Sequence, residues 1–218
     1  MSESVQVLRR RVTDLYTQSL ATRLYTELKM MILPLQDVSE QLPTRGLILD
    51  MGCGYGFVSN YLSLHSADRM IIANDPEEPR IAVARETVGS RTNIEFLAVD
   101  SREITRSDFD GVCVTDVLHH VPYDQQQALI DDVYRKLKPG GVLVIRETDK
   151  RIALRYYIFN WALEWFLYMG KEKLRFRHRD EWAKMFRRAG FEIERVVFNG
   201  RWFPYTTCLF VCRKPEHE

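Results

Sequence analysis

Short runs of apolar residues alternate with stretches of helical apolar spacing through the middle of the chain. Five runs are bounded by polar residues or glycines and cover residues 47–51, 70–74, 93–99, 111–115 and 141–147. Residues 47–51 can be buried on both faces, which is typical of a central strand in a parallel sheet. Helical spacing fills intervals near residues 56–65, 77–88 and 123–137. Strands and helices in alternation predict an α/β fold.

The N-terminal part follows a purely helical pattern. Apolar residues recur at helical spacing within residues 5–33, and Pro34 and Pro43 bracket the approach to the first strand. We expect these helices to cover the core and the ligand cleft. Tyr16 and Tyr25 are candidates for contact with a ligand, although ordinary packing is the commoner role of such residues.

The C-terminal part returns to strand alternation. Residues 191–198 and 206–213 flank Asn199-Gly200, which predicts a closing hairpin that supplies the last two strands. Nothing in the sequence indicates a second domain.

Three glycines at alternate positions mark the end of the first strand. Gly52, Gly54 and Gly56 follow Asp50, and helical spacing resumes directly after them. This predicts a turn at a helix N-terminus, where a ligand can approach bare backbone. The spacing differs from the G-x-G-x-x-G of dinucleotide sites, and a carboxylate at Asp50 favours a cationic ligand group over a pyrophosphate. The alternative is a tight turn with a helix-capping acid and no ligand.

The next three strands also end in polar residues. Asp75 ends the second strand 25 residues after Asp50, where an acid can bind both ribose hydroxyls; a dinucleotide site would predict the same acid. Asp100-Ser101 ends the third strand and suits an adenine edge, and Asp116 ends the fourth. The carboxyl ends of parallel strands form one edge, so these residues predict a ligand crevice there.

These motifs together resemble the class I S-adenosylmethionine-dependent methyltransferases of the small-molecule and lipid type. The resemblance covers residues 45–148. It rests on the glycine segment and on four further strings: Asn-Asp at 74–75, Val-Asp-Ser at 99–101, Thr-Asp-Val-Leu-His-His-Val-Pro at 115–122 and Leu-Lys-Pro-Gly-Gly-Val-Leu-Val-Ile at 137–145.

The resemblance implies a Rossmann-like sheet of seven mostly parallel strands, with helices on both faces and an antiparallel last strand. It implies S-adenosylmethionine as cofactor and S-adenosylhomocysteine as product. The glycine turn would hold the methionine portion, Asp75 the ribose, Asp100 and Ser101 the adenine, and the backbone near Asp116 the amino group. The implied cofactor-binding residues are Asp50, Gly52, Cys53, Gly54, Asp75, Pro76, Asp100, Ser101, Asp116 and Val117.

Composition agrees with a single enzyme domain of 218 residues. A net charge of +1 offers no general attraction for nucleic acid. The four cysteines show no C-x-x-C spacing, so we expect no metal site and buried thiols in a reducing compartment. Residues 1–11 are charged and lack the apolar core of a signal peptide, so a cytoplasmic location is expected, with a membrane surface as a further option.

The segment after the fifth strand is basic and aromatic. Residues 150–188 contain 11 Lys or Arg, 4 Asp or Glu and 10 of the 25 aromatic residues. Residues 152–169 predict one helix, which three polar residues make unfit to span a bilayer. One interpretation is a helix packed on the core or on a second subunit, followed by a solvated basic tail at 171–179. The other is a lid over an apolar or aromatic acceptor, whose basic rim meets an anionic carrier protein or lipid headgroup.

Two histidines are the candidate catalytic residues. Methyl transfer mainly requires alignment and exclusion of water, but a phenol-type oxygen acceptor benefits from a base, and His119 and His120 are best placed to provide one. We expect one to face the crevice and the other to pack, with a slight preference for His119 as the base. Glu147 and Asp149 form a second candidate pair, although solvated loop acids are the commoner case.

The sequence therefore predicts a single methyltransferase domain in four parts: a helical cap (1–44), a cofactor-binding core (45–148), a helical lid or insertion (149–190) and a closing hairpin (191–218). We expect methyl transfer to a small aromatic or lipid-like acceptor, with oxygen favoured over carbon or nitrogen, and a homodimer through the aromatic insertion as one arrangement. The rival functions are a non-catalytic cofactor-binding or regulatory subunit and a nicotinamide-dependent oxidoreductase.

Overall fold

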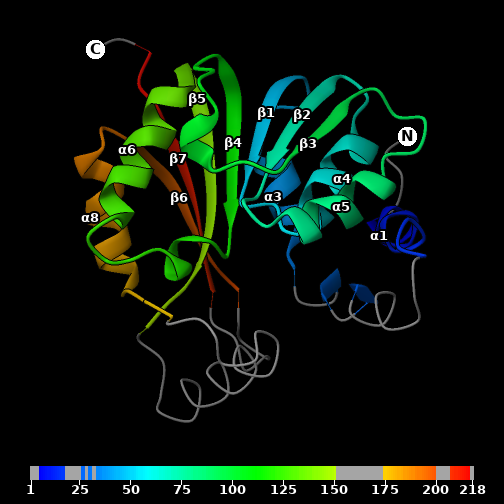
Figure 1. Ribbon diagram of the computed structural model, residues 1–218. Coiled ribbons are helices and arrows are strands. Elements are labelled where there is room, and N and C mark those ends of the chain that lie inside the picture. Colours follow the sequence, from blue (N-terminus) through cyan, green and yellow to red (C-terminus); the bar gives the residue numbers. More distant parts are fainter. Residues whose placement is uncertain are drawn as a thin grey trace. The chain divides into compact units, whose positions relative to one another are not determined.

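The computed structural model describes residues 5–17, 26–27, 29–30, 33–150, 174–199 and 207–216 (Figure 1). These residues contain a seven-stranded sheet with the hydrogen-bonded strand order β3-β2-β1-β4-β5-β7-β6. The strands are β1 (Gly46–Met51), β2 (Arg69–Asn74), β3 (Ile94–Leu97), β4 (Phe109–Thr115), β5 (Leu137–Thr148), β6 (Glu192–Asn199) and β7 (Thr207–Arg213). The predicted α/β fold is confirmed. The chain forms two compact units, Met1–Cys113 and Val114–Glu218.

The first unit is built on three parallel strands. β1 pairs with β2 and β2 with β3, all in parallel register, and Ile48, Leu49 and Ile71 are completely buried. Its helices are α1 (Val5–Thr13), α3 (Leu35–Gln41), α4 (Phe57–His65) and α5 (Glu78–Glu86). α4 packs on β2 and β3, α5 packs on β3, and α1 and α3 pack on α4. β1 and most of β2 thus lie buried within the unit, whereas Met70 is 37% exposed and β3 alternates buried and exposed residues.

Helix α3 lies within the predicted helical cap (1–44), but beyond residues 5–33, where the helical spacing was recognised. It lies between Pro34 and Pro43, which bracket the approach to β1. Its Leu35 and Val38 are almost completely buried, and the guanidinium of Arg69 donates hydrogen bonds to the carbonyls of Ser39 and Leu42 at its C-terminal end. A helix this short is marginal by itself, so these tertiary contacts account for it.

The second unit contains β5, β6 and β7, which are joined by antiparallel pairing. β7 pairs antiparallel with both β5 and β6, which confirms the antiparallel last strand. Helices α6 (Gln126–Lys136) and α8 (Arg179–Arg188) pack on β5 and β6 respectively, and the short helix η2 (Leu118–His120) contacts β5. Trp182 and Phe186 of α8 are completely buried, and the ring of Phe186 meets that of Phe210 on β7 at 5.1 Å.

The basic, aromatic insertion is described only in its last part. Residues 152–169 and Tyr25 lie outside the described residues. From Leu174 onward the chain is no solvated tail: Phe176 is buried, and Asp149 forms an isolated bridge with Arg177. Among the residues that the structure describes, no helix is long and apolar enough to cross a membrane.

Candidate active site

The glycine turn after β1 is held by the end of β2. The N–H groups of Gly52 and Cys53 both donate to the carbonyl of Asn74, at 2.8 and 2.9 Å. Gly52, Gly54 and Gly56 have φ values of +72°, +54° and +78°, a left-handed conformation that other residues adopt at a cost. A Cβ added at Gly54 would meet nothing within 4 Å, so this part of the turn leaves open space beside bare backbone.

Asp50 lies beneath the turn as a capping acid for α4. Its side chain is 1% exposed and accepts hydrogen bonds from the hydroxyl of Ser59, in the first turn of α4, and from the thiol of Cys113 at 3.4 Å. Burial raises the pKa of the Asp50 carboxyl to about 6, although the hydrogen bonds from Ser59 and Cys113 oppose that shift. The helix-capping role, expected of a turn without a ligand, is therefore present, and a nearby cationic ligand group would stabilise the ionised form.

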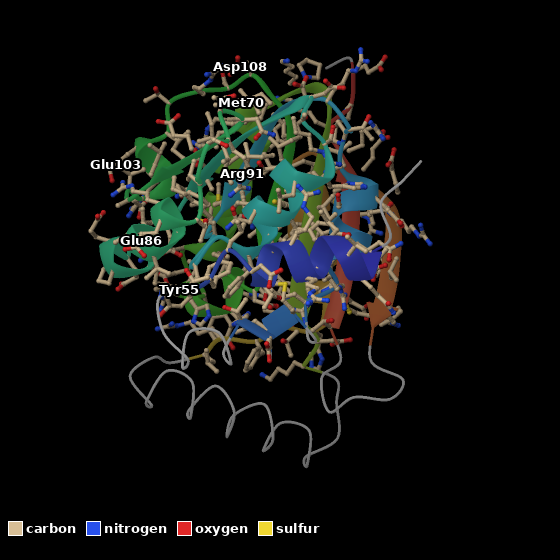
Figure 2. The ribbon with its side chains drawn as sticks, turned by 90° about the vertical axis from the view of Figure 1, so that its right-hand side faces the viewer. Tyr55, Met70, Glu86, Arg91, Glu103 and Asp108 are labelled. Atoms are coloured by element: carbon tan, nitrogen blue, oxygen red, sulfur yellow. The ribbon has the colours of Figure 1, made fainter. Side chains whose placement is uncertain are left out.

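Asp75 joins the glycine turn to the end of β2. Its Oδ2 accepts the N–H of Gly54 at 3.0 Å and its Oδ1 accepts the N–H of Glu77 at 2.9 Å. The structure thus brings together two residues that the sequence had placed at one ligand site. Pro76 follows as an exposed residue ahead of α5. In this unit Tyr55, in the turn, lies at the opposite end from Met70 and Asp108, which mark the starts of β2 and β4 (Figure 2).

The end of the third strand is tied to the second. The amide of Asn74 donates to the carbonyl of Val99 at 3.1 Å, directly before Asp100 and Ser101. Asp100 caps the short helix η1 (Ser101–Glu103) and forms a two-point ion pair with Arg102, whose side chain is 76% exposed. An exposed pair of this kind contributes little to stability, so a ligand could displace it. Ser101 is 9% exposed at the start of η1.

In the second unit, Asp116 makes a strained turn after β4. It has φ +58°, which is uncommon outside glycine, and its carboxylate is paired with the buried guanidinium of Arg146 on β5. Its N–H donates to the carbonyl of Arg146 at 3.0 Å. Among the described residues, the Nε of Arg146 and the Oγ1 of Thr115 are buried without a hydrogen-bond partner. Such strain and unsatisfied polarity are typical of functional turns.

Glu147 organises the histidine turn that follows. Its Oε1 accepts the N–H groups of Val117 and Leu118, at 3.1 and 2.6 Å, and its Oε2 lies 2.7 Å from Nδ1 of His119. The carboxylate of Glu147 and the imidazole of His119 thus form a buried pair within hydrogen-bond distance. Glu147 is 0% and His119 1% exposed, whereas His120 is half-buried with its ring 4.4 Å from that of His119. The second candidate pair is thus not solvated: Glu147 is an internal anchor, and Asp149 is buried as well.

The last part of the insertion contacts the backbone of this turn. The N–H and Nη1 of Arg175 donate to the carbonyls of His119 and His120, at 2.8 and 3.0 Å. The buried amide of Gln126 donates to the carbonyls of Leu118 and Arg175, at 2.9 and 3.3 Å. These contacts fix the backbone of the two histidines from a segment about 55 residues later in the chain. The sequence offered no signal for them beyond the basic composition.

Comparison with known proteins identifies the family. A family described as "Methyltransferase domain" matches residues 24–196. The ubiquinone biosynthesis O-methyltransferase of Cereibacter sphaeroides is 29% identical over 178 residues, which cover 75% of this chain and 69% of that protein. The carboxy-S-adenosyl-L-methionine synthase of Actinobacillus succinogenes is 30% identical over 105 residues, and the match spans 46% of this chain and 44% of that protein. The chain belongs to the methyltransferase-domain family.

Solved structures of similar fold agree with this assignment. Magnesium protoporphyrin IX methyltransferase from Synechocystis PCC 6803, with bound S-adenosylhomocysteine, gives a TM-score of 0.68 at 19% identity and covers 94% of this chain and 93% of that chain. A Burkholderia thailandensis N1-methyltransferase with bound 1,6-didemethyltoxoflavin and S-adenosylhomocysteine gives 0.66 at 19% identity, with 96% and 88% covered. This methyltransferase is of class I and uses S-adenosylmethionine, as the resemblance of its motifs implied.

Proposed function

We propose that this methyltransferase transfers the methyl group of S-adenosylmethionine to a hydroxyl oxygen of a small aromatic or lipid-like acceptor. The observation that carries the proposal is the histidine turn, in which a buried Glu147 fixes His119 and His120 lies half-buried against it. A rigid pair of imidazoles is suited to take a proton from an acceptor hydroxyl near neutral pH. The relative named as an O-methyltransferase supports oxygen as the receiving atom.

When bound, S-adenosylmethionine would supply an electrophilic methyl group to a lone pair of the acceptor oxygen, and the electron pair of the carbon–sulfur bond would stay on sulfur in the product S-adenosylhomocysteine. The acceptor proton passes to an imidazole. We assign this role to His120, because His119 is completely buried and its Nδ1 is committed to Glu147; His119 is then a positioning residue. This division follows from burial, whereas the sequence pattern slightly favoured His119 as the base.

The cofactor would be held by the residues that the motifs indicate. Asp75 would accept the ribose hydroxyls, Asp100 and Ser101 would meet the adenine, and the glycine turn would receive the methionine portion. Hydrogen bonds to a carboxylate are stronger than neutral ones, so Asp75 would supply the largest single polar contribution. Support comes from the buried position of Asp75 and its link to Gly54.

The acceptor would be a single small molecule, free or presented by an acidic carrier or an anionic membrane surface in the cytoplasm. The basic residues of the insertion support this. Of the basic residues that the structure describes there, Arg175 and Arg177 donate hydrogen bonds to other residues of the second unit. We therefore propose Lys171 and Lys173, which lie outside the described residues, for the anionic contact. A dimer through the aromatic insertion stays a prediction for the same reason.

Mass spectrometry with isotope-labelled S-adenosylmethionine tests the activity. Catechols and phenols with short and long alkyl chains are incubated with the enzyme, beside amines and carboxylic acids as chemical controls. We expect label in a phenolic hydroxyl. Label in an amine or on carbon would contradict the oxygen assignment. Tight binding of S-adenosylhomocysteine without product from any extract or acceptor would favour a regulatory subunit, and calorimetric binding of a nicotinamide cofactor instead would favour an oxidoreductase.

Histidine variants then test the roles. His120→Asn should lower kcat at least a hundredfold and remove the acidic limb of the pH–rate profile, with S-adenosylhomocysteine affinity nearly unchanged. His119→Asn should lower kcat but keep that limb, because the base remains. His178→Asn on α8 is the matched control, since asparagine can also cap a helix. Loss of the limb in the His119 variant alone would reverse the assignment.

A further inference from the structure

The phenol of Tyr16 connects the N-terminal segment to the cofactor turn. Tyr16 follows α1, and its N–H donates to the carbonyl of Thr13 at 3.1 Å, so the end of the helix holds its backbone. Leu8 and Val12 on α1 are buried, which docks the helix on the unit. Tyr16 itself is 0% exposed, and its ring lies 4.8 Å from that of Phe57 in the first turn of α4.

The hydroxyl of Tyr16 both donates and accepts a hydrogen bond. It donates to the carbonyl of Tyr55 in the glycine turn at 2.7 Å and accepts from the amide of Asn60 at 2.9 Å. Burial raises the pKa of the Tyr16 phenol far above its usual value, so the hydroxyl keeps its proton and remains a donor. In the observed conformation, both of these hydrogen-bond partners of the Tyr16 hydroxyl belong to the protein.

The carbonyl that it binds lies at the most permissive point of the turn. Tyr55 stands between Gly54 and Gly56, both with positive φ, so the peptide plane between residues 55 and 56 has little conformational restraint of its own. That plane is fixed on one side by the N–H of Gly56, which donates to the carbonyl of Cys53 at 2.9 Å. Tyr16 fixes the other side. Removal of the phenol hydroxyl would leave this peptide plane with only the hydrogen bond from the N–H of Gly56 to Cys53.

The same hydroxyl is part of a buried polar network behind the turn. The amide oxygen of Asn60 accepts from Arg91 at 2.5 Å, and its nitrogen donates to Thr87 at 2.8 Å. The N–H of Asn60 donates to the carbonyl of Gly56 as the first helical hydrogen bond of α4. Tyr16 is therefore held by its backbone bond to Thr13, by its ring contact with Phe57 and by the hydrogen bonds of its hydroxyl. The hydroxyl in turn holds the backbone of the glycine turn.

We propose that Tyr16 is a positioning residue for the cofactor turn, and that its hydroxyl couples docking of residues 5–17 to binding of the adenosyl cofactor. The inference rests on the proposed function only in assigning the cofactor to the glycine turn. Coupling is reciprocal: if docked residues 5–17 favour the cofactor, the cofactor favours docking to the same extent.

Calorimetry with S-adenosylhomocysteine tests the first half of the proposal. Tyr16→Phe keeps the ring and its packing on Phe57 but deletes the hydroxyl, and affinity should fall roughly tenfold, the usual effect of losing a buried hydrogen bond. Tyr61→Phe is the matched control, because Tyr61 on α4 is also almost completely buried, and its ring lies 6.0 Å from that of His65, the last residue of the helix. Equal affinities of the two variants would overturn the proposal.

Hydrogen–deuterium exchange tests the second half. In the wild-type protein, saturating S-adenosylhomocysteine should slow exchange of residues 5–17; in Tyr16→Phe this effect should be lost even at saturation. Unchanged exchange in the wild type would refute the coupling, whatever the stability of the variant. A wild-type protein that binds S-adenosylhomocysteine and methylates an acceptor but shows no coupling leaves the proposed function intact. A wild type that binds no S-adenosylhomocysteine would overturn both.

Discussion

Alanine at Gly54 and at Gly56 should separate the folding of the cofactor turn from its binding. Both glycines have positive φ, so an alanine at either position carries a backbone cost of about 1–2 kcal/mol. Their surroundings differ. A Cβ at Gly54 meets nothing within 4 Å, whereas a Cβ at Gly56 would lie 2.6 Å from the ring of Phe96 and 3.2 Å from the Cβ of Ala84.

The magnitudes follow from these distances. Phe96 is 4% exposed and cannot move aside freely, so overpacking adds about 1–3 kcal/mol at Gly56. Gly56→Ala should therefore lower the free energy of unfolding by about 2–5 kcal/mol in total. Gly54→Ala should lower it only by the backbone cost. Its affinity for S-adenosylhomocysteine should nevertheless fall at least tenfold, or about 1.4 kcal/mol, because the methyl group occupies the space left for the ligand.

Gly89→Ala supplies the control. Gly89 also has positive φ (+58°) and open space around its Cβ position, but it lies between α5 and β3. Urea denaturation and calorimetry on the three variants give both quantities. The reasoning fails if Gly54→Ala binds S-adenosylhomocysteine as tightly as Gly89→Ala, or if Gly56→Ala is as stable as Gly89→Ala.

Three further substitutions test other parts of the site and core. Asp75→Ala should weaken S-adenosylhomocysteine binding at least tenfold in calorimetry, and unchanged affinity in a folded variant would place the ribose elsewhere. Because the pKa of Asp50 is about 6 in the folded protein, above its unfolded value, protonated Asp50 stabilises the fold: this contribution is complete below about pH 4 and is lost as the pH rises through 6. The difference in unfolding free energy between wild type and Asp50→Asn should thus shift by roughly 1–2 kcal/mol from about pH 5 to about pH 7.5, and a flat difference would contradict the raised pKa. Trp182→Ala should cost about 3–5 kcal/mol of stability in urea denaturation, and a smaller loss would show that α8 is not part of the core.

The strands and the cofactor motif could be predicted from local patterns in the sequence. The apolar runs at 47–51 and 70–74 match β1 and β2 to within one residue, because strands buried on both faces need continuous apolar side chains. The glycine spacing after Asp50 predicted the turn correctly, because the left-handed backbone at Gly52, Gly54 and Gly56 strongly favours glycine. These are local requirements, and local patterns record them.

The hydrogen-bond partners of the polar side chains could not be predicted in the same way, because they depend on tertiary packing. The sequence did not show that Asp50 would be hydrogen-bonded to Ser59 of α4. It did not show that Tyr16 would bind the carbonyl of Tyr55, which lies 39 residues later in the chain. It also did not show that Glu147 would pair with His119, 28 residues before it. A buried carboxylate or phenol needs a hydrogen-bond partner, but the sequence does not show which residue that partner is. Which donor or acceptor meets it depends on how distant segments pack, and that packing made His119 the anchored histidine and His120 the more accessible one.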